Sequence, residues 1–454
     1  MTRLRIGIDG YNLVLPHGTG IATYGFMLAQ TLKSMGHEVE GVFGLDVGRD
    51  PALREAQFYD RLVRPPPVRR AKRRIRRTID TLGMMFGADA LNVPKGQVVT
   101  TAFDDRLPGF DRLFSSPHLF ERAHAYFRLT GRITTLRMAN PPDIMHWTYP
   151  VPVRVAGARN IYTIHDVVPL RLPFATLDEK QGYRTLVEAC LRQADHVCTV
   201  SEASRRDILS HFAISPERVT NTYQISSMDQ ALLDEDPLEA ARMVEGVFGL
   251  RHRGYFLFFG SIEPKKNLGR LIEAYLSLGT QTPLVIVAGR SWQSEAELRL
   301  LPREEEAGDP QYAHLTDRVI RIEYLPRRLL MRLARGARAV TFPSLYEGFG
   351  LPAHEAMLLG APVLSSTTGS IPEIAGDAAL LADPYDVSAI AAALARLDGD
   401  AELRDELSAR GPIQARAFSA ENYRERLRVM YARSLSASQY PILGMEARID
   451  GHAG

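Results

Sequence analysis

The sequence of 454 residues has few cysteines, almost no net charge and no long apolar stretch. Its two cysteines, Cys190 and Cys198, are too few for a disulfide framework or an all-cysteine zinc site, and they suit a reducing compartment. Lys and Arg total 55 against 53 Asp and Glu, so a formal charge of +2 excludes a protein that coats nucleic acid through its overall charge. No window approaches the roughly 20 apolar residues that span a bilayer, and the N-terminus has Arg and Asp where a signal peptide needs an apolar run. We therefore expect a folded cytoplasmic protein which, if it meets a membrane, does so from one side.

Several catalytic signatures are also missing. The 12 histidines include no HExxH pair, and the chain has neither the GxSxG elbow nor the GxxxxGKS loop of P-loop proteins. The acidic run Asp234 to Pro237 looks like a metal-binding carboxylate motif, but no strand precedes it. We expect no metal and no resident cofactor.

Short β-branched runs alternate with helical stretches in both halves of the chain, which is typical of βαβ units on parallel sheets. The predicted fold class is α/β, with two Rossmann-like doubly wound domains facing a cleft. We expect an N-terminal domain over residues 1–225, a linker over 226–253, a C-terminal domain with crossover helices over 254–436 and a tail over 437–454. The expected strands begin at Arg5, Glu38, Asp143, Asn160, His196, Val219, Tyr255, Pro283, Arg318, Ala337, Pro362 and Ala378.

An insertion of the first domain, about 46–140, separates two recognisable strands, and insertions of that size often carry function. It contains the basic run RRAKRRIRR, with Arg70, Arg73, Arg74 and Arg77. The run is either a solvated helix face or a surface that binds anionic lipid or phosphate, where each cation contributes about 1 kcal/mol. Nucleic acid is disfavoured because the run lacks interleaved aromatic residues.

The most informative stretch runs from Phe342 to Ser366. A strand there leads into Glu347, Gly348, Phe349 and Gly350, and Pro352 then opens a helix that Gly360 ends. The loop thus follows the carboxyl end of a parallel strand, where α/β sheets bind ligands, and the helix N-terminus suits a phosphate. Glu355 is expected in the first turn of the helix.

With these residues in view, the sequence resembles the retaining glycosyltransferases of family 4, which have the GT-B fold. The resemblance rests on EGFGLPAHEAM from Glu347, GSIPEIAGDAALLADPYD from Gly369 and FFGSIEPKKNLGRLIEAY from Phe258. It is weaker in the first half, where it rests on GTGIATYG from Gly18, IHDVVPLRLP from Ile164 and TVSEASRRDIL from Thr199. The insertion is not covered.

The resemblance implies roles for individual residues. Glu347 would face the donor sugar, Glu355 would accept hydrogen bonds from the nucleotide ribose, and Lys266 would reach the diphosphate. Relatives often carry an arginine on the phosphates where this chain has Ser261. The Ser261 hydroxyl could still bind the donor by donating to a phosphate oxygen, but Lys266 would neutralise more of the charge. Arg290 is a weaker candidate for a phosphate contact. His165 resembles the catalytic-site histidine. Donor-binding residues would also include Gly18, Gly20, Lys265, Gly348, Phe349, Gly350 and Leu351.

The function implied is retaining transfer of a sugar from a nucleotide-sugar co-substrate, with GDP-mannose as the first guess, to a lipid-linked glycan or polysaccharide of a bacterial-type surface. The partners would be that donor, a glycan acceptor and an anionic membrane surface, with no nucleic acid; the enzyme would be cytoplasmic or peripheral at the inner face of the membrane. Three alternatives stay open: an inactive nucleotide-sugar-binding scaffold, a sugar-nucleotide epimerase and a synthase with a soluble acceptor. We also expect the last helix to cross back to the first domain, anchored by Phe418 and Tyr423.

Overall fold

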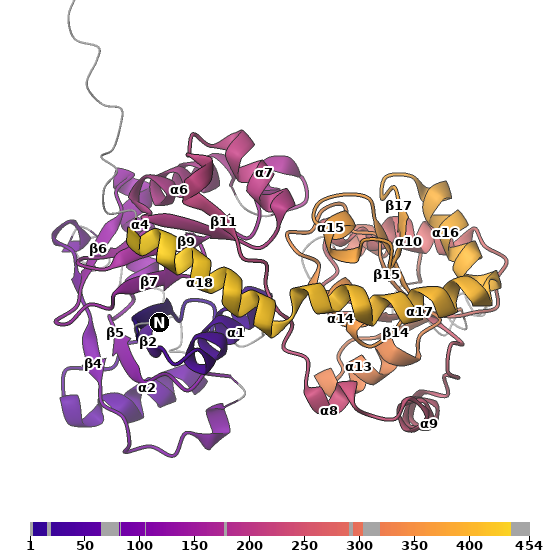
Figure 1. The fold of residues 1–454 in the computed structure, drawn as a ribbon, viewed down its shortest axis with the longest axis horizontal. Coiled ribbons are helices and arrows are strands. Elements are labelled where there is room, and N and C mark those ends of the chain that lie inside the picture. The colour runs from indigo at the N-terminus through magenta and orange to yellow at the C-terminus, as the bar shows by residue number, and fades with distance from the viewer. Residues whose placement is uncertain are drawn as a thin grey trace, which may run out of the picture.

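The computed structural model describes residues 3–15, 20–64, 81, 83–104, 106–176, 179–289, 294–302 and 318–436. Its strands form two large sheets, one in each half of the chain, and a small third sheet (Figure 1). The first large sheet is parallel except for its edge strand β4. Its strands, in spatial order, are β11 (Val219–Asn221), β10 (His196–Thr199), β9 (Arg159–Thr163), β7 (Ile144–Trp147), β1 (Arg5–Asp9), β2 (Glu38–Phe43), β5 (Arg112–Ser115) and β4 (Leu91–Val93).

Helices cover both faces of this sheet, because successive residues of its strands point to opposite sides. Ile144 packs into the core on one face and Met145 into the core on the other. The first face carries α1 (Gly20–Ser34), α2 (Arg54–Val63) and α18 (Ala420–Ser436), and the second carries α4 (Leu119–Thr130), α6 (Lys180–Gln193) and α7 (Glu202–His211). The small sheet consists of β3 (Ala88–Asp89), β6 (Thr134–Arg137) and β8 (Val153–Val155).

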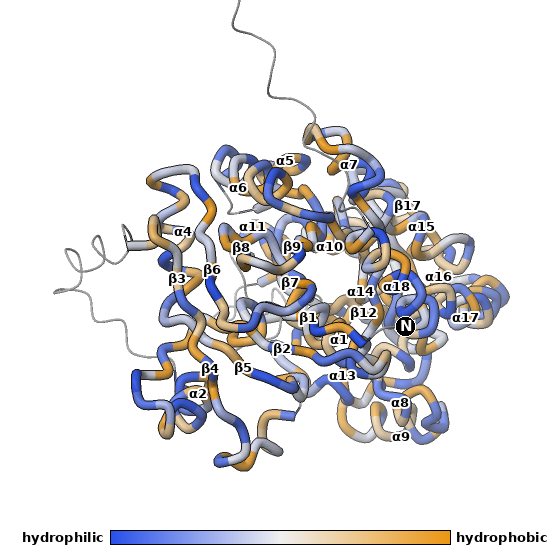
Figure 2. Tube along the Cα trace, turned by 60° about the vertical axis from the view of Figure 1, so that its left-hand side comes forward, coloured by the Kyte–Doolittle hydropathy of each residue, from blue (hydrophilic) through white to orange (hydrophobic). Residues whose placement is uncertain are grey.

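The second large sheet is parallel throughout. Its order is β14 (Val319–Ile322), β13 (Leu284–Val287), β12 (Phe256–Phe259), β15 (Ala339–Phe342), β16 (Val363–Ser366) and β17 (Leu380–Ala382). In this sheet too, alternate residues of β12 and β13 pack into two separate hydrophobic cores. The helices are α10 (Leu268–Leu276), α11 (Ser294–Glu297), α13 (Arg327–Gly336), α14 (Leu351–Leu358), α15 (Ile371–Ala375), α16 (Val387–Gly399) and α17 (Ala401–Ala415). Hydrophilic and hydrophobic residues alternate along outer helices such as α17 (Figure 2).

Every strand that the sequence predicts is present, so the expected α/β class is confirmed. One expectation needs correction. Residues 46–140 are not wholly an insertion, because β5 lies within them and pairs in parallel with β2 in the main sheet. The expected linker, residues 226–253, contains α8 (Gln230–Leu233) and α9 (Pro237–Phe248), which contact α13.

The last helix, α18, leaves the C-terminal domain and lies across the N-terminal domain beside α1 (Figure 1). Phe418 and Tyr423 are buried in the same core as α1, which confirms them as anchors of this crossing. The Tyr431 hydroxyl also hydrogen bonds to Nδ1 of His146 on β7, at 2.7 Å. The tail over 437–454 lies outside the described residues. Of the helices within the described ranges, none is both long and apolar enough to cross a membrane.

Candidate functional site

The loop between β15 and α14 (343–350) lies where the two domains meet. Gly350, the residue before α14, has φ +92°, a conformation that favours glycine. At Gly348 an added Cβ would lie 2.9 Å from the carbonyl oxygen of His165 and 3.2 Å from Oδ2 of Asp166, both in the N-terminal domain. Glycine therefore permits the two domains to approach at this point. Phe349 and Gly350 are buried, and Leu351 is partly buried.

Glu347 is paired with Lys266, whose Nζ donates to Oε1 at 2.7 Å. Their side chains are only 12% and 15% exposed, so water screens the pair weakly. Burial alone would raise the pKa of the Glu347 carboxyl, but the charges of Lys266 and Lys265 outweigh burial and hold its pKa below the usual range. Glu347 is thus an ionised acceptor at neutral pH, and Lys266 a cation held at its side.

Lys265 lies beside the same carboxylate. Burial would lower the pKa of its ammonium group, but Glu263, Asp166 and Glu347 raise it. Its Nζ is 3.6 Å from Oε1 of Glu263, which also accepts a hydrogen bond from the Ser261 hydroxyl at 3.0 Å. The backbone carbonyl of Lys265 accepts from the amide of Leu345, which ties this segment to the β15–α14 loop. Ser261 itself is exposed and carries no charge, so the two lysines supply the positive charge here.

Glu355 is buried, with 4% of its surface exposed. It lies in the second turn of α14, since the helix begins at Leu351; the expectation of the first turn is wrong by one turn. Its Oε1 accepts from the Arg327 guanidinium at 2.6 Å and from the Ser226 hydroxyl at 2.9 Å. Oε2 keeps lone pairs for a further donor such as a ligand hydroxyl.

In the N-terminal domain, His165 follows β9 and packs edge-on against Tyr24, with ring centroids 4.8 Å apart. Its Nε2 is 2.9 Å from the carbonyl oxygen of Thr148. A carbonyl only accepts, so Nε2 carries the proton and Nδ1 is an acceptor. Burial lowers the pKa of the imidazole, which keeps the ring neutral.

Asp9, which sequence reasoning missed, supports this arrangement from the end of β1. It is fully buried, and its carboxylate accepts from the amides of Thr148 and Tyr11. Burial raises its pKa to about 6. Asp9 thus accepts from the amide of Thr148, and His165 donates to the carbonyl of the same residue. Together they fix the position of Thr148. Its place at the end of a central strand is the signal that could have identified it.

Further contacts join the domains at the loop. The Tyr346 hydroxyl donates to Oδ2 of Asp207 on α7 at 2.5 Å, and Arg171 of α5 (Val168–Arg171) lies 3.3 Å from the other oxygen of Asp207. Glu373 on α15 accepts from the first two amides of α7, those of Glu202 and Ala203. Side chains from both domains also form a small apolar cluster, namely Val168, Leu172, Ala175, Leu345 and Tyr346.

Some predicted site residues cannot be placed. Gly18 and the basic residues Arg70, Arg73, Arg74 and Arg77 lie outside the described residues, as does Arg290. Gly20 is described and is the exposed first residue of α1. The structure thus brings Lys265, Lys266 and Glu347 together, and it places His165 across the domain interface from Gly348.

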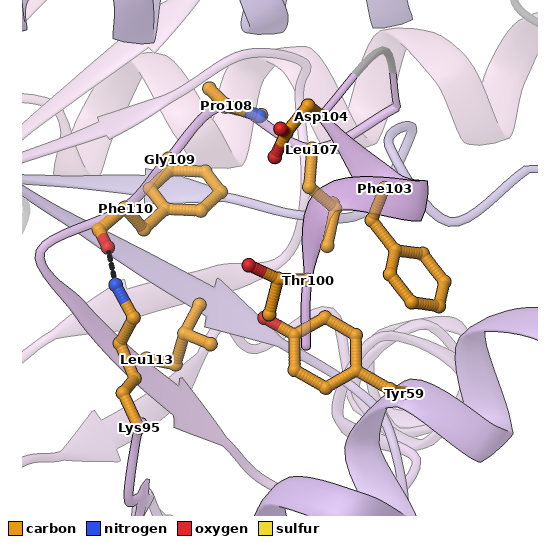
Figure 3. A pocket seen from close by; sticks show the side chains of 10 residues that line it. All are labelled: Tyr59, Lys95, Thr100, Phe103, Asp104, Leu107, Pro108, Gly109, Phe110 and Leu113. Atoms are coloured by element: carbon orange, nitrogen blue, oxygen red, sulfur yellow. Dashed lines mark hydrogen bonds between the residues drawn. The ribbon is translucent and has the colours of Figure 1, made fainter. Parts of the chain in front are cut away.

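A hollow of about 50 Å³ in the N-terminal domain contains none of the predicted site residues (Figure 3). Its walls include Tyr59, Lys95 and Asp104, and Lys95 donates to the carbonyl of Phe110 (Figure 3). Residues 108–110 end one residue before Asp111, which precedes β5, so this hollow lies at the amino end of a parallel strand. The loops that hold His165 and Glu347 follow the carboxyl ends of their strands, where ligands of α/β sheets bind.

The site combines two kinds of group. The lysine pair and the N-terminus of α14 attract an anion such as a phosphate. Glu347, Glu355 and the neutral His165 offer acceptor atoms to which ligand hydroxyl groups can donate. A ligand with both phosphates and hydroxyls matches this arrangement.

Comparisons with known proteins agree with this chemistry. The family model for glycosyl transferases group 1 matches residues 250–414, and that for glycosyltransferase family 4 matches residues 97–223. The second match includes part of residues 46–140, so the resemblance extends further into that segment than the sequence motifs suggested. O-antigen chain mannosyltransferase B from Escherichia coli is 34% identical over 77% of this chain and 89% of its own length.

Solved structures show the same fold at low sequence identity. A sucrose-phosphate synthase from Thermosynechococcus elongatus has a TM-score of 0.62 and 18% identity, covering 96% of this chain and 100% of its own. Anabaena HepE in complex with UDP-glucose has a TM-score of 0.63 and 14% identity, covering 95% of this chain and 100% of its own.

Proposed function

The chain belongs to the family 4, group 1 glycosyltransferases, and from that premise we propose that it transfers mannose from GDP-mannose to a lipid-linked glycan or polysaccharide acceptor, with retention of the anomeric configuration. Its fold is GT-B. The observation that carries the proposal is the part-buried Lys266–Glu347 pair in a chain 34% identical to an O-antigen chain mannosyltransferase.

The donor would lie along the β15–α14 loop. Lys266, Lys265 and the N-terminus of α14 would stabilise the diphosphate as it leaves, which is where preorganised charge lowers the barrier most. Glu347 would hold hydroxyl groups of the sugar, Glu355 those of the ribose, and the amides from Gly18 to Gly20 would approach the diphosphate from the other domain. His165, neutral and with Nδ1 as acceptor, would orient a hydroxyl of the sugar or of the acceptor.

Retention by double displacement needs a carboxylate nucleophile, as in glycosidases whose two carboxyls are about 5 Å apart. Here Glu347 is occupied by Lys266. We propose instead that the acceptor attacks on the face from which the diphosphate leaves. The acceptor oxygen bonds to the anomeric carbon as the carbon–oxygen bond to the diphosphate breaks, and the hydroxyl proton passes to the leaving phosphate oxygen. The lysines supply the charge in this step, so transfer should continue when a chelator removes divalent metal.

The experiment that tests this function measures mannosyl transfer by Glu347→Ala and Lys266→Ala. Both variants should retain the fold and lose most transfer. Lys33→Met is a matched control, because Lys33 pairs with Asp111 at 3.6 Å in an exposed position, and it should transfer at the wild-type rate. Near-wild-type turnover by both site variants would refute the assignment of this loop.

Slow hydrolysis of the donor without acceptor separates the alternatives. A live transferase or soluble-acceptor synthase should release GDP and free sugar, an epimerase should release an epimerised sugar, and an inactive scaffold should release neither. A soluble-acceptor synthase is then distinguished by its use of a water-soluble acceptor.

We also propose that the enzyme works at the cytoplasmic face of the membrane, docked through the basic run around Arg73. The described residues that follow this run support the proposal, since Met85 and Phe86 are 59% and 73% exposed. Charge reversal of Arg70, Arg73, Arg74 and Arg77 should abolish binding to anionic liposomes at low salt and spare donor binding. Unchanged liposome binding would mean that the run is a solvated helix face.

A further inference from the structure

Tyr24 on α1 is a buried tyrosine beside His165 that the proposed mechanism does not use. We infer that Tyr24 is a positioning residue for the His165 imidazole, and that Tyr431 of the last helix holds Tyr24 in place through a buried chain of hydrogen bonds. The inference rests on the proposed function, because His165 must contact a reacting group for its orientation to affect transfer.

The ring of Tyr24 limits how the ring of His165 can turn. Nε2 of His165 donates to the carbonyl of Thr148 at 2.9 Å, but one hydrogen bond fixes one atom and lets a ring tilt about it. The rings of Tyr24 and His165 have centroids 4.8 Å apart and planes at 86°, the edge-to-face arrangement that aromatic pairs favour. The contact blocks tilting on this side, and it thereby fixes the direction in which Nδ1 of His165 points.

The hydroxyl of Tyr24 is in turn linked to α18. It lies 2.9 Å from Oγ1 of Thr163 on β9. The same Oγ1 lies 2.8 Å from Nε2 of His146 on β7, and Nδ1 of His146 lies 2.7 Å from the hydroxyl of Tyr431. Thr163 is two residues before His165, so the strand directs both side chains to the same face.

The chain is continuous in protons as well as in distance. Burial lowers the pKa of His146 to about 3, so its imidazole is neutral, with one donor and one acceptor nitrogen. Each link of the chain then holds one proton, whichever way the chain runs. The four side chains are between 0% and 2% exposed, so removing one hydroxyl leaves a buried polar atom unpaired, and water cannot take its place.

Each member of the chain comes from a different element, namely α1, β9, β7 and α18. His165 itself lies in the loop that follows β9, and groups on rigid helices and strands are held more precisely than groups on loops. Since α18 reaches this domain from the end of the chain (Figure 1), the crossing helix supplies a support for the site as well as apolar contacts with α1.

The test measures kcat for mannosyl transfer and the affinity for GDP by calorimetry, both with the full-length protein. Tyr24→Leu removes the ring contact and should lower kcat about ten- to a hundredfold. Tyr24→Phe and Tyr431→Phe keep their rings and lose one hydroxyl, so each should lower kcat about two- to tenfold. GDP lacks the sugar, so its affinity should stay within about twofold of the wild type in all three variants.

A double-mutant cycle tests the chain itself. In the Tyr24→Phe background, adding Tyr431→Phe should lower kcat by less than about twofold, because members of one hydrogen-bond network are not additive. Tyr162→Phe is the matched control. Tyr162 precedes Thr163 in β9, is fully buried in the core on the other face, and donates to the carbonyl of Val153 at 2.6 Å. Its loss should lower the melting temperature and leave kcat unchanged.

His165→Ala separates this inference from the proposed function. Loss of transfer in His165→Ala, with wild-type kcat in the Tyr24 and Tyr431 variants, would overturn the inference and leave the proposed function standing. Additive losses in the cycle, or an equal loss of kcat in Tyr162→Phe, would also overturn it, because kcat would then follow stability and not the chain. Where Tyr24→Leu does not fold, the two phenylalanine variants decide.

Two other results reach further back. Wild-type turnover by His165→Ala would refute the role proposed for His165, and this inference with it. Absence of transfer by the wild type would refute the proposed function itself.

Discussion

Replacing Tyr346 with Phe should impair the enzyme without damaging either domain. The Tyr346 hydroxyl is the donor of a 2.5 Å hydrogen bond from the C-terminal domain to Asp207 of the N-terminal domain. The Asp207 side chain is 12% exposed, and among the described residues it would keep only Arg171, at 3.3 Å on its other oxygen. A hydrogen bond to a charged group contributes about 1.5–3 kcal/mol, and about 1.4 kcal/mol is a tenfold change in an equilibrium constant. The equilibrium constant for the closed arrangement, with the domains in contact beside Glu347, should fall about ten- to a hundredfold.

The assay is kcat/KM for donor turnover, together with the radius of gyration from small-angle X-ray scattering. If catalysis needs the closed arrangement, Tyr346→Phe should lower kcat/KM by up to this factor and give a more open average shape. Tyr255→Phe is the control, because its hydroxyl donates at 2.6 Å to the carbonyl of Leu333 within the C-terminal domain. That variant should lose stability and keep its kcat/KM. A Tyr346→Phe enzyme within twofold of the wild type would refute the reasoning.

Two further predictions concern stability. The pKa of buried Asp9 is raised from 3.8 to about 6, so the folded state binds this proton more tightly than the unfolded state, and the contribution of Asp9 to stability falls as the pH rises through this interval. The unfolding free energy of the wild type minus that of Asp9→Asn should therefore fall by roughly 3 kcal/mol between about pH 4 and pH 7 in urea titrations; a difference that is constant or rises would contradict it. Leu427→Ala on α18, at a fully buried position, should destabilise the protein by about 2–5 kcal/mol in the same assay. The exposed neighbour Glu425, whose partner Arg428 lies in the same helix, is the control: Glu425→Ala should change the unfolding free energy by less than about 0.5 kcal/mol, and equal effects would mean that α18 does not anchor the crossing.

The parts of the fold that could be predicted from sequence are those with a local signal. The sequence predicts the apolar runs of β12 and β13 because their residues are neighbours in the chain. The same is true of the loop from Glu347 to Gly350. β5 was missed because its four residues follow Pro108 and Gly109 and show no longer apolar run. Its identity as a strand depends on pairing with β2, which is distant in sequence.

The same distinction applies to the site. Lys266 and Glu347 were predicted as separate residues through the family resemblance, but their direct pairing across 81 positions of chain was not. Arg327 was missed because its importance depends on Glu355, which lies on another helix. Tyr346 and Asp207 were missed because each looks ordinary in its own segment, and only the contact between the domains brings them together.

The central claim is that this chain binds a guanine nucleotide sugar at the β15–α14 loop. The most direct measurement is a thermal-shift panel of GDP, UDP, dTDP and ADP and their common sugar conjugates, since a ligand at 100 times its dissociation constant stabilises a protein by about 2.7 kcal/mol. The account predicts that GDP and GDP-mannose raise the midpoint most and that Lys266→Ala abolishes the shift. No shift with any nucleotide, or the same shift in Lys266→Ala, would contradict it.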